Sequence, residues 1–358
     1  MISITFLCLS WLLTACSPAL PGTRPDNHAE ACPAGLPGTP GSVTDVFVEP
    51  DDARAPVLNE LNAAQCSIDI AVYLITDEAI IVALENAAAR GVRVRLILEE
   101  HPYGGGGGQD ELADRLRPQG IELKWSDNEF RFTHAKYILV DRQVALILNL
   151  NLTVSAFTNN REFGVVSTNA EAVAEAQHIF DRDWQGDRAA TADGPLIVSP
   201  VNSRQRYMAL IGNARTSIDL YVEVIRDDEV IQGLGEAVQR GVRVRLIVNA
   251  AQTDDDRKVV AQLTAVGVEV SVSTGLYIHA KLMVIDDQTA VVGSQNFTPT
   301  SLDANREIAM QFTDALPVAR CLAMFEADWN AARPGANRVP DMLFSSHSKV
   351  LPLTVPAA

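Results

Sequence analysis

A tandem duplication limits the possible folds of this sequence more than any other feature. Early blocks recur with an offset of 150 residues and later blocks with an offset of 145. Because a repeat of about 150 residues has the size of a domain, the sequence predicts two similar halves, half one at 46–190 and half two at 191–333. The recurring blocks are SIDI at 67–70 and SIDL at 217–220, GVRVRL at 91–96 and 241–246, His134 and His279, NRE at 160–162 and 305–307, and DW at 183–184 and 328–329.

Each half begins with the periodicity of a strand, a helix and a second strand. Residues 68–74 and 92–98 are rich in β-branched and other apolar residues, and 77–90 between them has the spacing of a helix that stops before a glycine. Several short strands follow, and a helix closes each half at 170–184 and 315–332. This pattern indicates an α/β fold.

The first 16 residues resemble the signal peptide of a bacterial lipoprotein. An apolar run too short to span a bilayer ends in the segment from Leu13 to Cys16, which would make Cys16 the lipid acceptor. Because no Lys or Arg precedes this run, a cleaved secretory signal stays open as the alternative. Residues 17–45 are typical of a Pro/Gly-rich tether, and 334–358 of a polar tail. We expect an exported, membrane-anchored protein on the periplasmic side of a bacterial envelope or at the cell surface.

Charge and cysteine content argue against two classes of partner. The formal net charge of −16 would repel polyanions at long range, so a nucleic-acid partner is disfavoured. Outside the signal peptide the cysteines are odd in number, and none has the spacing of a zinc ligand set. We therefore expect no metal and no cofactor, and a monomer.

Two equivalent blocks, HAKYILVD and HAKLMVID, share the pattern HxK with an Asp seven residues after the His. In an extended segment the side chains at i and i+2 point the same way, so each histidine and its lysine face one site. The odd offset of seven places the aspartate on the opposite face, which suggests support of the site. We assign all six residues to the catalytic set. They are His134, Lys136 and Asp141 in half one, and His279, Lys281 and Asp286 in half two.

Further polar residues follow each block. An i, i+2 pair with amide or hydroxyl groups can donate hydrogen bonds to phosphate oxygens. A later glutamate could accept the Nδ1 proton of a histidine, fix its tautomer and leave Nε2 free to attack. Each half therefore supplies half of one site. These supporting residues are Asn149, Asn151 and Glu162 in half one, and Ser294, Asn296 and Glu307 in half two.

With these residues the sequence resembles the phospholipase D superfamily, whose mark is a pair of HxKxxxxD blocks followed by GSxN and a glutamate. The resemblance covers roughly residues 46–332. It implies two α/β/α sandwich halves with mixed sheets, packed about a pseudo-twofold axis with the active site at the seam. It also implies that Lys136, Lys281, Asn151 and Asn296 hold the nonbridging oxygens of a phosphodiester.

The resemblance further implies a two-step reaction without a metal. One histidine attacks phosphorus to form a phosphohistidine, and the other protonates the leaving alcohol and then activates water or an acceptor alcohol. In many members the first histidine is the nucleophile, so we assign that role to His134 and the acid role to His279, with the reverse assignment open. Half one departs from the family pattern, because Leu148-Asn149 replaces Gly-Ser and puts phosphate placement there in question. Glu223 is a further candidate for substrate contact.

Three functions fit these observations. The leading hypothesis is a phospholipase D-like enzyme that hydrolyses or transfers the headgroup of a phospholipid, because an anchor at Cys16 would hold the site beside that substrate. A nuclease-type phosphodiesterase of the same superfamily is the first alternative, which the acidic charge disfavours. A catalytically weak phosphate-binding module is the second.

Overall fold

The computed structural model describes residues 43–103, 108–126, 129–187 and 194–332. The signal peptide with Cys16, nearly all of the tether and the tail at 334–358 lie outside these residues, so the lipid anchor stays a prediction. The first strand begins at Val43, inside the segment that the sequence analysis gave to the tether. None of the helices in the described ranges combines the length and the apolar character that a bilayer-spanning segment needs.

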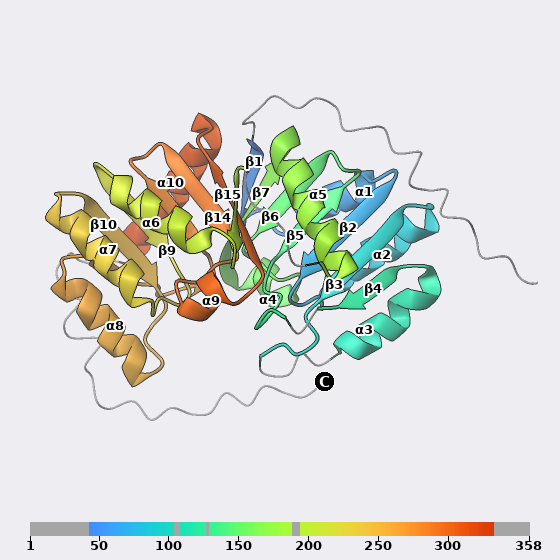
Figure 1. Cartoon of the computed structure of the whole chain (residues 1–358), viewed down its shortest axis with the longest axis horizontal. Coiled ribbons are helices and arrows are strands. Elements are labelled where there is room, and N and C mark those ends of the chain that lie inside the picture. Colours follow the sequence, from blue (N-terminus) through green and yellow to red (C-terminus); the bar gives the residue numbers. More distant parts are fainter. Residues whose placement is uncertain (1–42, 104–107, 127–128, 188–193, 333–358) are drawn as a thin grey trace, which may run out of the picture.

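Two mixed sheets with the same strand order form the two halves, which lie side by side (Figure 1). Along the seven-strand order of each sheet, three strands run parallel and the others pair antiparallel, as the predicted α/β fold requires. The first sheet has the order β1 (Val43–Glu49), β7 (Asn160–Ser167), β6 (Val144–Leu148), β5 (Tyr137–Val140), β2 (Ser67–Val72), β3 (Arg93–Leu98) and β4 (Glu122–Trp125). The second has the order β8 (Leu196–Ser199), β15 (Glu307–Phe312), β14 (Thr289–Gly293), β13 (Leu282–Ile285), β9 (Ser217–Tyr221), β10 (Arg243–Val248) and β11 (Glu269–Val272).

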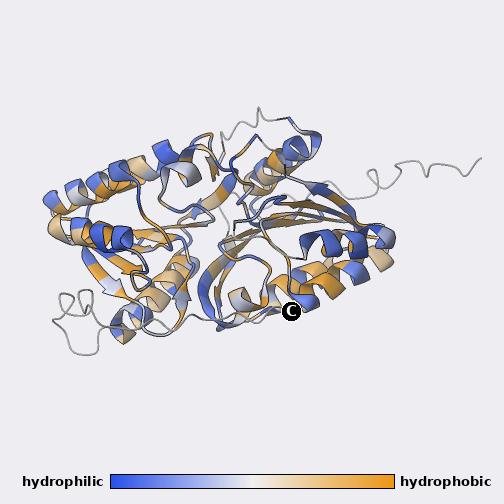
Figure 2. Cartoon of the chain, turned by 90° about the horizontal axis from the view of Figure 1, so that it is seen from below, coloured by the Kyte–Doolittle hydropathy of each residue, from blue (hydrophilic) through white to orange (hydrophobic). Residues whose placement is uncertain are grey.

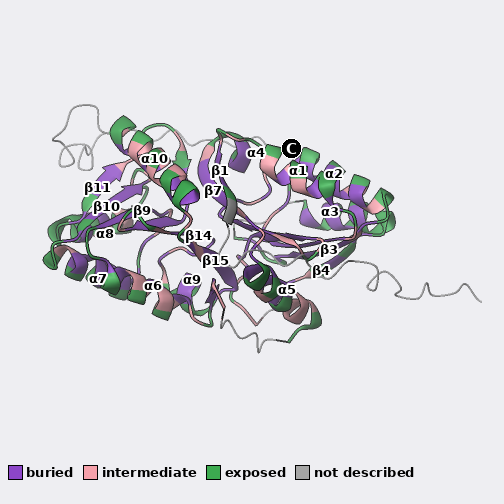
Figure 3. Ribbon diagram, turned by 90° about the horizontal axis from the view of Figure 1, so that it is seen from above, coloured by how far each residue is buried: buried purple, intermediate pink, exposed green. Residues whose placement is uncertain are grey.

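The helices repeat in the same order along both halves and lie against the sheets, with exposed residues on their outward surfaces (Figure 3). The helices that close the halves, α5 and α10, end within one residue of their predicted ends. Half one contains α1 (Ala55–Ala63), α2 (Glu78–Ala89), α3 (Gln109–Leu116), the 3₁₀ turn η1 (Arg117–Gln119), α4 (Val154–Thr158) and α5 (Ala170–Gln185). Half two contains α6 (Ser203–Asn213), α7 (Asp228–Gln239), α8 (Asp254–Ala265), the short strand β12 (Tyr277–Ile278), α9 (Pro299–Asp303) and α10 (Ala315–Ala331).

The equivalent helices α2 and α7 begin and end alike for local reasons. Asp77 accepts hydrogen bonds from the N–H groups of the first turn of α2, and Asp227 does the same for α7. Gly91 and Gly241 follow these helices with φ of 90° and 91°, which residues with a Cβ rarely adopt. This explains why the repeated GVRVRL block starts with glycine.

Apolar side chains form an outer core in each half and a shared core at the seam, and the orange apolar stretches of Figure 2 lie mainly on the inward surfaces of the strands and helices. The shared core contains residues of both halves, such as Tyr137 and Tyr221. Ala135 and Ala280, the middle residues of the two HAK segments, are fully buried in it. The core therefore fixes both HxK segments at the seam.

The two halves also exchange polar contacts. Arg161 of half one pairs with Asp328 of half two at 2.7 Å, and Arg306 of half two pairs with Asp183 of half one at 2.9 Å. The short strand β12 of half two pairs with β7 of the first sheet. Both arginines are buried, and removing one partner of such a pair typically costs about 3–5 kcal/mol. The repeated NRE and DW blocks thus hold the seam together.

Candidate active site

Each histidine of the HxK blocks is held by a glutamate from the opposite half. Nδ1 of His134 lies 2.9 Å from Oε2 of Glu307, and Nδ1 of His279 lies 2.8 Å from Oε1 of Glu162. Both glutamates are fully buried. A carboxylate at Nδ1 keeps the proton on that nitrogen and leaves Nε2 free. The sequence predicted that a glutamate holds the Nδ1 proton, and the structure shows that this glutamate comes from the opposite half.

The glutamates are themselves held by neighbouring side chains. Asn305 donates from Nδ2 to Glu307 at 2.9 Å, and Ser301 donates from its hydroxyl to the same oxygen at 2.6 Å. Asn160 donates to Glu162 at 3.1 Å. The asparagine of the NRE block therefore orients the glutamate of that block, which in turn orients the histidine of the other half.

A lysine stands beside each histidine. Lys136 donates from Nζ to the carbonyl oxygen of His134 at 2.6 Å, and Lys281 donates to that of His279 at 2.7 Å. Burial lowers the pKa of Lys136 to about 7; the charge of Lys281 acts in the same direction, against the attraction of Glu307. These lysines provide the positive charge of the site. In the described part of the chain, no three His, Cys, Asp or Glu side chains are grouped as ligands of a metal ion.

The rings of both histidines reach the protein surface. The side chain of His134 is 16% exposed and that of His279 13%. Burial lowers the pKa of His134, and the charge of Lys136 adds to this effect against the attraction of Glu307. The ring of Tyr73 packs edge-on against His134, with 4.9 Å between ring centroids. The lowered pKa thus favours the neutral form of His134, whose side chain is partly exposed.

One pair of equivalent positions near the histidines holds different residues, which are Tyr73 in half one and Glu223 in half two. Oε2 of Glu223 lies 2.7 Å from Nζ of Lys281 and 3.6 Å from Nε2 of His279. Burial alone would raise the pKa of Glu223, but the charges of His279 and Lys281 hold it well below its usual range. The sequence analysis named Glu223 as a candidate and missed Tyr73, although the offset of 150 relates the two.

The hydrogen bonds of Asp141 and Asp286 go to main-chain groups and not to the imidazoles, which agrees with the supporting place that their odd offset suggested, while their assignment to the catalytic set stays a prediction. Seven residues of extended chain separate each aspartate from its histidine, which corresponds to about 20 Å. Each carboxylate instead accepts hydrogen bonds from main-chain N–H groups at the start of a neighbouring strand. The donors are Gln65, Cys66 and Ser67 for Asp141, and Arg215, Thr216 and Ser217 for Asp286. Both aspartates therefore fasten the turn after their own strand to β2 or β9.

Asn149 and Ser294 are also not available to a phosphate, contrary to the prediction. Both are fully buried, and the side-chain oxygen of each accepts a hydrogen bond from the main-chain N–H fourteen residues later. Asn149 further donates from Nδ2 across the seam to the carbonyl oxygens of Lys281 and Gly293. Its amide therefore links the halves behind the site, which a serine would be too short to do.

The replacement of glycine by Leu148 has a matching change on the neighbouring strand. In half two Gly293 pairs with Ala309, and a Cβ on Gly293 would lie 2.1 Å from the Cβ of Ala309. In half one Leu148 pairs with Gly164. Each half thus keeps one glycine in this closely packed pair, which sits on β14 in half two and on β7 in half one.

Asn151 and Asn296 occupy equivalent positions in the two halves and differ in their hydrogen bonds. Asn296 lies next to Glu223, with 3.3 Å from Nδ2 to Oε2, and its Oδ1 accepts the N–H of Val224. Asn151 takes the equivalent place in half one, and its Oδ1 is buried without a hydrogen-bond partner among the described residues. A phosphate oxygen at Nδ2 of Asn296 would therefore have to displace the Glu223 carboxylate, and the phosphate-holding role of both asparagines stays a prediction.

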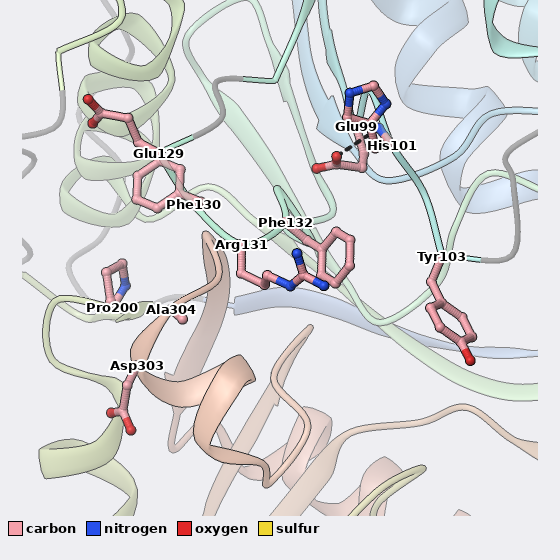
Figure 4. A pocket seen from close by; sticks show the side chains of 10 residues that line it. All are labelled: Glu99, His101, Tyr103, Glu129, Phe130, Arg131, Phe132, Pro200, Asp303 and Ala304. Atoms are coloured by element: carbon pink, nitrogen blue, oxygen red, sulfur yellow. Dashed lines mark hydrogen bonds between the residues drawn. The ribbon is translucent and has the colours of Figure 1, made fainter.

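A pocket of about 880 Å³ is lined by residues of both halves (Figure 4). Phe132 lines it and contacts Tyr73 edge-on, with 6.1 Å between ring centroids, and Tyr73 contacts His134. The guanidinium of Arg131 lies 5.0 Å from the centroid of the Phe132 ring. The lining residues are Glu99, His101, Tyr103, Glu129, Phe130, Arg131, Phe132, Pro200, Asp303 and Ala304. Both halves therefore line the pocket, and Phe132 connects it through Tyr73 to the ring of His134.

Comparison with known families and curated proteins agrees with this architecture. The family model described as "Cardiolipin synthase, PLD-like domain" matches residues 57–184 and again 207–329. Cardiolipin synthase of Geobacillus kaustophilus is 26% identical over 326 residues, covering 77% of this chain and 64% of that protein. Human mitochondrial cardiolipin hydrolase is 30% identical over 173 residues, covering 48% of this chain and 63% of that protein. The chain thus spans a little less than two thirds of the length of these relatives.

Two solved structures have a similar fold. Phosphatidylserine synthase of Haemophilus influenzae superposes with a TM-score of 0.65 at 11% identity, covering 82% of this chain and 88% of that chain. Polyphosphate kinase of Porphyromonas gingivalis superposes with a TM-score of 0.63 at 20% identity, covering 79% of this chain and 50% of that chain. At such low identity the likeness concerns the fold alone, and it confirms the predicted α/β architecture of two similar halves.

Proposed function

This chain belongs to the phospholipase D superfamily, and from that membership we propose that it transfers or hydrolyses the headgroup of a phospholipid through a covalent phosphohistidine. The observation that carries the proposal is the pair of crossed histidine–glutamate contacts. Each one binds Nδ1 of a histidine from one half to a glutamate of the other, which leaves Nε2 for chemistry at the seam. The relatives include a synthase and a hydrolase, so both an alcohol and water are candidate acceptors.

In the first step Nε2 of His134 attacks phosphorus, and the bond from phosphorus to the leaving alcohol oxygen breaks. His279 gives its proton to that oxygen. The neutral state of His134 suits a nucleophile. Both ring nitrogens of His279 face carboxylates, of Glu162 and Glu223, which suits a ring that carries and delivers a proton. These environments support the assignment of roles made from the sequence.

In the second step water or an acceptor alcohol attacks phosphorus and loses its proton to His279. The bond between phosphorus and Nε2 of His134 breaks, which regenerates the enzyme. The nonbridging oxygens gain charge in both transition states, and we assign their stabilisation to Lys136, Lys281 and Asn151, with Asn296 beside them. We propose that these groups act without a metal ion.

The pocket lined by Phe132, whose ring contacts Tyr73, is suited to the part of the lipid next to the phosphate. Its aromatic walls, which include Tyr103, Phe130 and Phe132, offer apolar contact to the glycerol backbone. An anchor at Cys16 would keep the site close to a membrane surface, in agreement with the proposed substrate. The net charge of −16 weighs against a nucleic acid in the same place.

Headgroup release from phospholipid vesicles tests this function against the alternatives, with single-stranded DNA as a parallel substrate and EDTA in both reactions. We expect release from vesicles that persists in EDTA and is lost in His134→Ala, while the exposed control His178→Ala keeps full activity. Cleavage of DNA alone would indicate a nuclease, and binding without turnover a phosphate-binding module. Complete loss of activity in EDTA would contradict the metal-free reaction.

A further inference from the structure

In half two, one carboxylate oxygen of Glu223 accepts hydrogen bonds from the side chains that we assign to phosphate binding. Oε2 of Glu223 lies 2.7 Å from Nζ of Lys281 and 3.3 Å from Nδ2 of Asn296. The same oxygen lies 3.6 Å from Nε2 of His279. These are the groups proposed to hold a nonbridging phosphate oxygen and to serve the leaving oxygen. In the free protein Glu223 therefore takes the position of an anion in half two.

Half one carries no such internal anion at the equivalent position, because Tyr73 stands there. The ring of Tyr73 lies beneath Nζ of Lys136, which is 5.1 Å from the ring centroid. The hydroxyl of Tyr73 accepts the main-chain N–H of Tyr103 instead. The two sides of the site are thus chemically different, although the fold that builds them is the same.

A phosphate and the Glu223 carboxylate cannot both use the same donors. Two anions that share one lysine in a partly buried site repel each other strongly, since the local dielectric constant is low. Glu223 has a second anchor, because the hydroxyl of Tyr277 donates to its Oε1 at 3.1 Å and Tyr277 is half exposed. The Glu223 side chain is 18% exposed, so a headgroup at the mouth of the site can reach its carboxylate.

We propose that Glu223 is a specificity-determining residue. Its carboxylate competes with phosphate for Lys281 and Asn296. A phosphodiester displaces the carboxylate from these donors when its headgroup offers O–H or N–H groups to Glu223. Such a headgroup gives the carboxylate new hydrogen bonds in place of those that the phosphate takes. The inference rests on the proposed function and deepens it, because it names the substrate class: phospholipids with primary ammonium or polyol headgroups.

Quaternary ammonium headgroups and polyanions fit the Glu223 carboxylate less well. A quaternary ammonium headgroup carries a positive charge but no N–H donor, so it replaces the lost hydrogen bonds poorly. A polyanion brings further negative charge toward Glu223 and is repelled. Glu223 therefore favours phosphatidylethanolamine over phosphatidylcholine, and both over nucleic acid.

Binding of inorganic phosphate, measured by titration calorimetry, tests the competition without any turnover. Glu223→Gln keeps the size of the side chain and removes its charge, and we expect it to bind phosphate at least ten times more tightly than the wild type. Glu236→Gln makes the same change on the exposed surface of α7 and should leave the affinity unchanged. Equal affinity for phosphate in the wild type and Glu223→Gln would overturn the inference.

Headgroup release from phosphatidylethanolamine and phosphatidylcholine vesicles tests the selection. We expect the ratio of the two kcat/KM values to fall about tenfold in Glu223→Gln, in line with the loss of one charge-assisted hydrogen bond. Glu223→Tyr, which copies half one, should show the same fall if the glutamine variant folds poorly. An unchanged ratio in a folded variant contradicts the inference. If the wild type releases neither headgroup, the proposed function fails, while the phosphate titration still decides whether Glu223 is a competing anion.

Discussion

Nδ1 of His134 lies 2.9 Å from Oε2 of Glu307, a residue 173 positions later in the chain and in the other half. The reciprocal contact joins His279 to Glu162. Neither half therefore contains a complete histidine–glutamate pair. The duplication supplies the parts twice, and the seam assembles them into one site.

Substitution of the crossing glutamate tests this dependence. Glu307→Gln removes the charge that holds the Nδ1 proton of His134, so the ring can adopt the tautomer without a free Nε2. In a serine protease the corresponding change of an orienting carboxylate costs about 10⁴ in kcat, and we expect a loss of about 10² to 10⁴. Steady-state assay of headgroup release measures it.

Glu171→Gln, on the exposed surface of α5, is the matched control and should retain full activity. Circular dichroism and a thermal melt check that Glu307→Gln is folded. A folded Glu307→Gln variant with the kcat of the wild type would show that the crossed contact does not orient the nucleophile.

Lys136 of half one should determine how kcat/KM falls on the alkaline side of the pH profile. Because burial lowers the pKa of Lys136 to about 7, its positive charge is present below this pH and is lost as the pH rises through it. Since kcat/KM reports the free enzyme, it should fall about tenfold per pH unit above about 7. Lys136→Arg keeps its charge at every accessible pH, so this variant should lack the fall, whatever its absolute rate. A wild-type profile that stays flat from pH 6.5 to 8.5 would be incompatible with the assignment.

The buried carboxyl group of Glu49 should make the free energy of unfolding depend on pH. It is fully buried and pairs across the sheet with Glu162, the glutamate that holds His279. Burial raises the pKa of Glu49 to about 8, and the charges of Asp52 and Glu162 add to this effect. The folded protein therefore keeps a proton on Glu49 up to about pH 8, whereas the unfolded chain releases it near the ordinary glutamate pKa of 4.5.

Because the folded state binds this extra proton, stability should decrease as the pH rises between these two values. The expected slope from this one group is about 1.4 kcal/mol per pH unit. Glu49→Gln removes the proton exchange, so its free energy of unfolding should fall less steeply than that of the wild type. Urea unfolding at pH 5, 6, 7 and 8 measures the difference, and identical slopes would refute the prediction.

The aspartates of the HxKxxxxD blocks should affect stability and not chemistry. Asp141 accepts main-chain hydrogen bonds from the start of β2, about 20 Å from His134 along the strand. Asp141→Asn loses the charge and one acceptor oxygen, which should cost about 1–3 kcal/mol of unfolding free energy. The kcat of the folded fraction should match the wild type. A tenfold lower kcat at unchanged stability would instead keep Asp141 in the catalytic set.

The sequence predicted the duplication, the α/β class and the facing of each histidine with its lysine, because these follow from repeats and periodicity within short segments. The origin of each orienting glutamate could not be predicted. Glu162 and Glu307 follow their own histidines in the chain, and only the packing of the seam shows that each serves the other half.

Hydrogen bonds and strand pairing with the main chain explain the other differences between the predicted and the observed site. Asn149 and Ser294 have side chains that suit a phosphate, but strand pairing buries both against the neighbouring main chain. Leu148 departs from the family pattern as an isolated change in the sequence. Its match, Gly164, becomes visible only in the register of β6 and β7.

In the proposed reaction one site takes its nucleophile from half one and its acid from half two, and trapping of the covalent intermediate distinguishes the two histidines. Rapid quenching of the enzyme with a labelled phospholipid at neutral to alkaline pH, followed by mass spectrometry, locates the phosphohistidine. We predict an adduct on His134 that is still detected in His279→Ala and is absent in His134→Ala. An adduct on His279, or one that forms in His134→Ala as readily as in the wild type, would contradict the account.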